Sequence, residues 1–316
     1  MRKVHVLALV AALAATALVV AGCGSSSTTS GSNTAGGLTA AQIMAKSQQA
    51  MAKVTSASFV ADATFKVSSP GSSAQAMLLG QAPIVLHIAG KAGDKTAGNG
   101  AAVAMALRAG GQNLTMGLKA VGKKTWVAFQ GRWYVVPVGK TRGAVSAGAS
   151  PRTAVGSLGI DPQKWAKSST VTTEQLNGAT VYHVATTADT TQIMDDLVKA
   201  LNDPALSKAT GSGAAALNQL KSSGELKTLE KSLTAASVEY WVDAKTFFVV
   251  KGKLDARLQF GGSSATQGVS GLGIDVTFAL GNVGQPVKVI PPAHALPLKK
   301  LTNSLSGLTS GAGIGL

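Results

Sequence analysis

The stretch VAMALRAGGQNLTMGL, residues 103–118, decides the fold class of this chain. Apolar side chains alternate with small or polar ones on both sides of Gly110-Gly111. A period of two is typical of a strand that is buried on one face. Adjacent glycines supply the positive φ angles that a tight turn needs. The stretch therefore predicts an antiparallel hairpin.

The same alternation continues outward from this hairpin along most of the chain. It predicts further strands over residues 58–67, 84–88, 125–129, 132–138, 170–176, 179–186, 238–242, 250–260 and 274–280. Asn177-Gly178 predicts a second tight hairpin. Two stretches have helical spacing instead, residues 39–54 and 190 to about 233. Runs of strands with grouped helices are typical of an α+β fold, here with helices covering one face of a curved antiparallel sheet.

The N-terminus has the pattern of an export signal that ends at a modified cysteine. Arg2 and Lys3 precede 16 uncharged residues, Val6–Ala21, and the only cysteine, Cys23, closes the run Val-Ala-Gly-Cys. This run looks like a bacterial lipobox, so we expect a signal peptide over 1–22 and diacylglyceryl attachment to Cys23. The alternative is an uncleaved transmembrane helix, but 16 residues fall short of the ~20 that span a bilayer.

Composition divides the mature chain into a tether, a domain and a tail. Residues 24–37 are mostly Ser, Thr, Gly and Asn, so we expect an acylated cysteine with a flexible tether over 23–37. A folded domain is expected over 38–298, and a disordered Gly/Ser-rich tail over 299–316. The expected location is the outer face of the cell membrane, in a periplasm-like space, held by lipid.

The chain is strongly basic, with a formal net charge of +15, and loss of Arg2 and Lys3 leaves +13. A basic balance usually suggests nucleic acid, but the export signal argues against that partner. Anionic lipid headgroups or wall polymers fit better, because Lys and Arg are attracted to such surfaces. A solvated basic surface without a partner is equally compatible.

The residues that support catalysis are scarce. Mature histidines stand alone at His87, His183 and His294, without metal-ligand spacing. No nucleophile elbow or dinucleotide fingerprint occurs, and the end of a phosphate loop at Gly139-Lys140-Thr141 lacks its leading glycine. We therefore expect no enzyme activity, no cofactor and no metal.

The apolar faces of the predicted elements are compatible with a solid core or with a cavity for an apolar ligand. Abundant Ala and Gly on these faces favour open volume, and methionines adapt to varied contents. The residues expected to line such a cavity are Ile43, Met44, Met51, Phe59, Phe65, Met105, Leu107, Met116, Leu118, Leu197, Leu254 and Leu258. Trp133 and Trp241 could rim its mouth or simply anchor packing.

Several short segments together resemble a known family. They are Leu38-Thr39-Ala40-Ala41, GRWY at 131–134, LNGATVY at 176–182, VEYWVD at 238–243 and PVKVIPP at 286–292. The chain is similar to the LolA/LolB-like lipid-carrier superfamily, and within it to the mycobacterial LppX/LprG-type lipoproteins. The resemblance implies a half-barrel sheet wrapped around helices, an apolar cavity for lipid or lipoglycan, and no catalytic residues. The chain departs from the pattern at 91–100, 139–150 and 205–224.

These observations give two hypotheses. The first is a cell-envelope lipoprotein that binds a lipid or other amphiphile and carries it between membrane and wall. The second is a non-catalytic interaction or sensor module whose half-barrel core is filled, with an envelope protein as its partner. A monomer that binds no nucleic acid is expected in either case.

Overall fold

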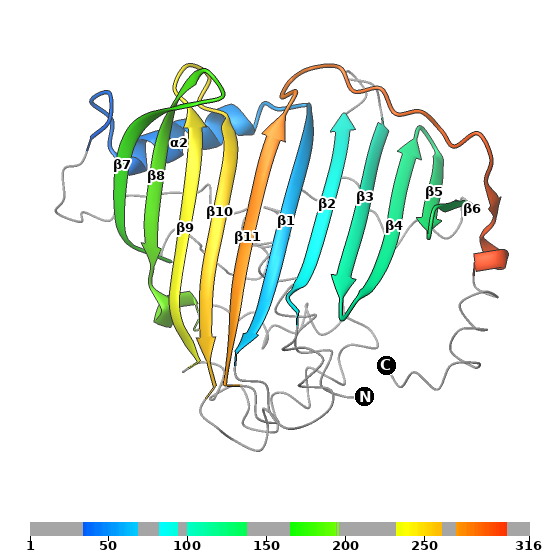
Figure 1. Ribbon diagram of the computed structural model, residues 1–316. Helices are drawn as coiled ribbons and strands as arrows, with labels where there is room; N and C mark the ends of the chain where they lie inside the picture. The colour runs from blue at the N-terminus through cyan, green and yellow to red at the C-terminus, as the bar shows by residue number, and fades with distance from the viewer. Residues whose placement is uncertain are drawn as a thin grey trace.

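The computed structural model describes residues 34–68, 82–93, 100–137, 165–193, 195, 232–260 and 270–301, and all its strands belong to one sheet (Figure 1). The elements are α2 (Ala40–Met51), β1 (Ser56–Ser68), β2 (Ile84–Gly93), β3 (Gly100–Ala109), β4 (Gln112–Val121), β5 (Lys124–Phe129), β6 (Arg132–Val136), β7 (Ala166–Leu176), β8 (Ala179–Ala188), β9 (Leu233–Asp243), β10 (Val249–Gln259), β11 (Gly271–Gly281) and β12 (Leu296–Pro297). The order across the sheet is β12-β6-β5-β4-β3-β2-β1-β11-β10-β9-β8-β7.

Tight turns connect the hairpins where the sequence predicts them. Gly110 and Gly111 have φ angles of 54° and 79° between β3 and β4, and Asn177 and Gly178 have 52° and 81° between β7 and β8. Such angles match the twist of paired strands, and glycine and asparagine adopt them at low cost. All strand pairs are antiparallel except β12 with β6, and the predicted curved antiparallel sheet is confirmed.

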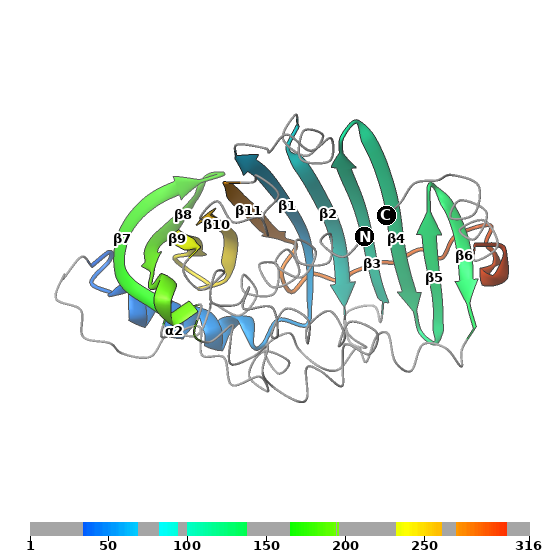
Figure 2. The ribbon, with the colours of Figure 1, turned by 90° about the horizontal axis from the view of Figure 1, so that it is seen from below.

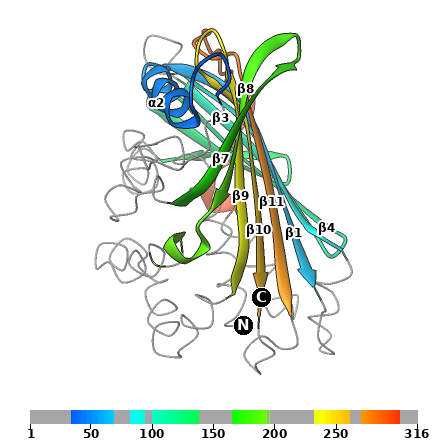
Figure 3. The ribbon, with the colours of Figure 1, turned by 90° about the vertical axis from the view of Figure 1, so that its left-hand side faces the viewer.

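The sheet has an apolar face and a polar face, which we call inner and outer. The inner face is the one that α2 covers, and the sheet curls toward α2 at its β7 end (Figures 2 and 3). Phe65, Ile274, Ala256 and Ala236 form one row across it from β1 to β9. All four are buried, so this row belongs to the core.

Helix α2 begins at a capping box and closes one end of the inner face. The Thr39 hydroxyl accepts a hydrogen bond from the Gln42 amide, and the Gln42 side chain accepts one from the Thr39 amide. Ile43 and Met44 are buried against inner-face residues of β8 and β9, including Val184. The helical period of residues 39–54 therefore brings one apolar stripe onto the sheet.

A C-terminal segment, residues 282–297, runs past the ends of the strands from β11 to β6, and we call it the strap (Figure 1). The Ser56 hydroxyl donates to the Gln285 carbonyl at 2.6 Å, and the Gly284 amide donates to the Ser56 carbonyl at 2.8 Å. The strap ends in β12, which pairs with β6 in parallel. The sequence predicts only an irregular tail after Pro291.

The expected α+β class is corrected to mostly β for the described residues. Only α2 forms a long helix there, and no described helix has the length and apolar character that would let it cross a membrane. Within the predicted helical region 190–233, residues 190–193 are helical after Asp189, but Leu233 is the first residue of β9. The stretch 196–231 lies outside the described residues, as do the predicted signal, Cys23 and residues 302–316. Residues 298–301 form a helical turn.

Candidate functional site

The inner face of β1 to β5 is the candidate binding surface, because strand register aligns apolar side chains into rows across it. One row joins Phe59, Gly90, Val103, Leu118 and Val127. The next row joins Ala61, Ile88, Met105, Met116 and Phe129. No described residue of β1 to β5 places a charged side chain on this face. The surface can therefore contact hydrocarbon without desolvating a charge.

The structure brings most of the predicted lining residues to this one face. The residues of strands that share it are Phe59, Phe65, Met105, Leu107, Met116, Leu118, Leu254 and Leu258. Ile43, Met44 and Met51 come from α2, which packs on the same face at the β7 end. Leu197 lies outside the described residues. A common face follows from the period of two, so the sequence contains this information.

Burial separates these residues into two groups. Ile43, Met44, Phe65 and Leu258 are between 0% and 7% exposed and lie inside packed clusters. Met116 is 39% exposed, and Phe59, Met105, Leu107 and Leu118 are half-buried. The second group is the part of the face that remains accessible to a ligand, whereas the first group holds the sheet and α2 together. The role of both groups in lining a ligand cavity stays a prediction.

Two inner-face glycines that the sequence analysis did not single out shape this surface. A Cβ at Gly90 would lie 2.5 Å from Cζ of Phe59, and one at Gly252 would lie 2.6 Å from Cζ of Phe278. Each phenylalanine ring therefore lies directly over the glycine backbone of the neighbouring strand. The absent side chains let the rings lie flat on the sheet.

The outer face carries a polar network on β7 to β10. His183 stacks on Trp241 with 4.4 Å between ring centres, and its Nε2 lies 2.9 Å from Oε2 of Glu239. Trp241 donates to Glu174, and Lys253 donates to Glu239 at 3.4 Å. Trp241 is thus buried on the outer face and rims no opening on the inner one.

The pKa of Glu239 reflects this network. Burial acts to raise it, but hydrogen bonds from His183 and Lys253 outweigh burial and hold the pKa below its ordinary value. Neither the network nor any other part of the described chain groups three or more His, Cys, Asp or Glu side chains as a metal ion requires.

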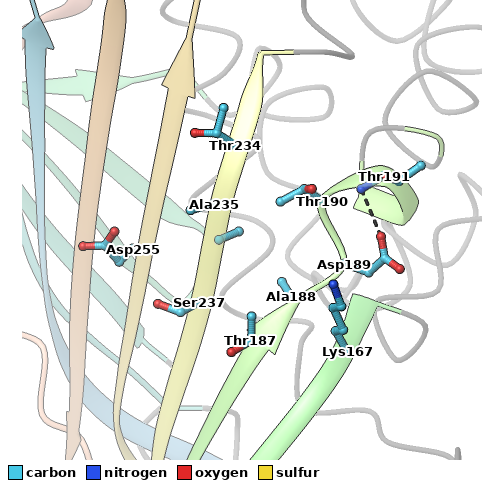
Figure 4. A pocket seen from close by; sticks show the side chains of 11 residues that line it. Lys167, Thr187, Ala188, Asp189, Thr190, Thr191, Thr234, Ala235, Ser237 and Asp255 are labelled. Carbon is cyan, nitrogen blue, oxygen red and sulfur yellow. Dashed lines mark hydrogen bonds between the residues drawn. The ribbon is translucent and has the colours of Figure 1, made fainter.

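A polar pocket of about 460 Å³ lies near the end of β8 (Figure 4). Thr187, Ser237 and Asp255 form one cross-strand row in it, and Lys167 and Asp189 lie beside them. Its carboxylates already have partners. Asp189 accepts hydrogen bonds from the Thr191 and Gln192 amides, and Asp255 accepts one from Arg257. Burial, followed by the neighbouring Asp275, raises the pKa of Asp255. Hydroxyl and charged groups make this pocket unsuited to a hydrocarbon chain.

Comparison with known proteins identifies structural similarities but no sequence family. No family model and no curated protein matches the chain. Lipoprotein LppX from Mycobacterium tuberculosis is 15% identical with a TM-score of 0.37, over 78% of this chain and 96% of LppX. LprF from Mycobacterium bovis is 13% identical with a TM-score of 0.39, over 80% of this chain and 96% of LprF. The chain is thus similar in structure to mycobacterial LppX-type lipoproteins, as the sequence resemblance implies.

Proposed function

We propose that this protein is a lipid-anchored envelope protein that binds the acyl chains of a lipid or other amphiphile on the inner face of β1 to β5. The observation that supports this most directly is the exposure of that face. Every inner-face side chain described on β2 to β5 is half-buried or exposed, although nearly all are apolar. On β8 to β11 most inner-face residues are buried beneath α2 or in the sheet core. An apolar surface that its own fold leaves partly exposed favours a ligand.

The chemistry of the surface suits hydrocarbon. Each buried CH₂ contributes about 0.8 kcal/mol on leaving water, but an acyl chain in a bilayer is already out of water. Transfer of an acyl chain from the bilayer to the protein exchanges one apolar environment for another. The fit of the chain to the protein surface therefore decides whether transfer is favourable. Met105 and Met116, which face each other on β3 and β4, are flexible enough to follow chains of different shape.

The role proposed is binding and carriage, with no catalysis. The described inner face of β1 to β5 has no ionisable group that could serve as an acid, a base or a nucleophile. The anchor is proposed from the Cys23 motif alone, which would hold the domain near the membrane from which it takes lipid.

A matched pair of variants tests the binding surface. Met116 on the inner face is 39% exposed and Val60 on the outer face is 42% exposed, so a glutamate at either position reaches solvent. We expect Met116→Glu to reduce the non-covalent lipid that copurifies with the full-length protein, because a carboxylate disfavours adjacent hydrocarbon. Val60→Glu should leave the lipid content unchanged.

The measurement is organic extraction of the purified full chain, followed by mass spectrometry of the released lipid per mole of protein. Wild-type protein without any copurified amphiphile would contradict the proposal, as would equal lipid loss in both variants. Cross-linking in cells that captures one envelope protein, in the absence of lipid, would support the interaction module instead.

A further inference from the structure

The acidic and basic side chains of the described residues are distributed unequally over two parts of the sheet. All described carboxylates lie on β1 or on the segments from β7 to β11, and they are Asp62, Glu174, Asp189, Asp195, Glu239, Asp243, Asp255 and Asp275. The described residues of β2 to β6 and of the strap contain lysines and arginines but no Asp or Glu. Among the described residues of the sheet, the net positive charge is therefore concentrated on the β2–β6 part.

On the outer face, described lysines and arginines have acidic partners only outside that part, and within it His87 of β2 lies 2.7 Å from Asp62 of β1. Lys66 pairs with Asp275 at 3.5 Å, Lys253 with Glu239 at 3.4 Å, and Arg257 with Asp255 at 3.0 Å. By register, Lys91, Arg108, Lys119 and Lys124 lie on the outer face of β2 to β5. No ion pair with a described carboxylate involves any of these four.

The same region of the outer face is hollowed into a shallow groove of about 420 Å³. Small residues line much of it, namely Ala89, Ala102, Ala104, Gly117 and Ala128, and Lys91, Lys119 and Trp133 line it as well. A Cβ at Gly117 would lie 3.2 Å from Cη2 of Trp133, so the indole lies close against the glycine. An apolar floor thus adjoins unneutralised ammonium groups.

Lys119 connects this groove to the strap. Its Nζ donates to the Ile290 carbonyl at 3.0 Å and lies 4.8 Å from the centre of the Trp133 ring. Lys119 and Trp133 are therefore held in place, whereas Lys91, Lys123 and Lys124 are exposed.

We propose that the outer face of β2 to β6 is a docking surface for the anionic headgroups of a membrane. Lysines near such a bilayer are attracted to acidic headgroups, and an indole with one apolar and one polar edge is suited to the membrane interface. A water-soluble polyanion would use the lysines but would gain nothing from the apolar floor. Docking through the outer face does not depend on lipid binding at the inner face.

Chemical footprinting of the full-length acylated protein in vesicles tests the proposal. Lysines are acetylated in vesicles of phosphatidylcholine alone and in vesicles that also contain phosphatidylglycerol, and each site is quantified by mass spectrometry. We expect Lys91, Lys119 and Lys124 to be labelled several-fold more slowly in the anionic vesicles, and high salt to restore the rate. Lys53, which is exposed just after α2, and Lys245, which is exposed on the β9–β10 turn, should label equally in both.

A charge-removal variant separates docking from simple crowding at the bilayer. Replacing Lys91 and Lys124 by Gln should lower the docking equilibrium constant about five-fold per lysine and so expose Lys119 to labelling. Lys53→Gln removes one charge elsewhere and should change nothing.

Three results would overturn the proposal. Labelling of Lys91, Lys119 and Lys124 that does not depend on anionic lipid would show that the surface does not dock. Protection by soluble polyphosphate equal to that by anionic vesicles would assign the surface to a free polyanion. Protection of Lys53 to the same degree would show general crowding. The wild-type footprint alone is decisive if the double variant folds poorly.

Discussion

Phe278 packs across Gly252 at the junction of the two core clusters of the inner face. Its ring contacts residues of both clusters, one centred on Phe65 and Ile274 and the other on Val242. The ring can occupy this position only because β10 has no side chain there. Glycine is usually unfavourable within a strand, but here the packing of the neighbouring Phe278 requires it.

Gly252→Ala should therefore destabilise the protein. The added methyl group would overlap the Phe278 ring and force it out of its place, and overpacking of this kind costs about 1–3 kcal/mol. The control is Gly273→Ala on β11, where the nearest atom is Nη1 at the end of the long Arg257 side chain, 3.3 Å away. Urea unfolding should show a lower midpoint for Gly252→Ala than for Gly273→Ala, and equal midpoints would contradict the packing argument.

Glu239 should make the free energy of unfolding depend on pH. Its pKa in the folded protein is lowered from 4.5 because His183 and Lys253 hydrogen bonds outweigh burial. Below 4.5 the unfolded chain then binds more protons than the folded one, so stability is lost as the pH falls through the lowered value. Above 4.5 the contribution is fully present.

The variant Glu239→Gln should reduce that dependence. We expect a loss of about 1 kcal/mol at pH 7, since two charge-assisted hydrogen bonds at a partly exposed site are weakened. The difference from wild type should shrink as the pH approaches 3. Urea titrations at pH 7, 5, 4 and 3 measure it, and a difference that stays constant over this range would refute the assignment.

At the scale of elements, the register of the hairpins and the packing of α2 build the inner face. Asn177-Gly178 and Gly110-Gly111 set the pairing of β7 with β8 and β3 with β4, and a slip of one residue would turn the apolar side chains outward. Helix α2 is only 12 residues long, so its stability depends on its cap and on its contacts with the sheet.

Thr39→Ala should weaken α2 without altering the binding surface. The variant removes the hydroxyl that accepts from Gln42, and losses of this kind cost about 1 kcal/mol. Thr39→Ser keeps the hydroxyl and should behave like the wild type. Hydrogen exchange of α2 amides measures the effect, and unchanged protection in Thr39→Ala would show that sheet packing alone holds the helix.

At the scale of the whole molecule, the sheet separates two kinds of surface. The inner face of β1 to β5 is apolar and partly exposed, while the outer face is charged at the β7 end and basic with a small groove at the β6 end. The strap crosses the strand ends and connects Ser56 of β1 with Lys119 of β4 and with β6. One sheet therefore presents an apolar surface on one side and a basic surface on the other, and the two proposals assign acyl chains to the first and anionic headgroups to the second.

The sequence alone was enough to locate most strands, the capped helix and the shared face of the predicted lining residues. These features depend on local rules, since a period of two and a glycine pair act within a few residues. The bounds were less well determined. Strand β1 extends two residues before the predicted start. Leu233 belongs to β9, although the spacing of the leucines that precede it predicts a helix.

The features that only the tertiary structure decided depend on contacts between residues that are far apart in the chain. The strap pairs with β6 across more than a hundred residues, and Leu296-Pro297 has no strand signal of its own. The sequence could not show which lining residues are sealed in the core, because burial of Ile43 depends on where α2 meets β8 and β9. It could not show either that the carboxylates of the described strands lie on β1 and on β7 to β11. Strand order is set by long-range pairing, and that order, rather than any local pattern, places charge and exposure on the surface.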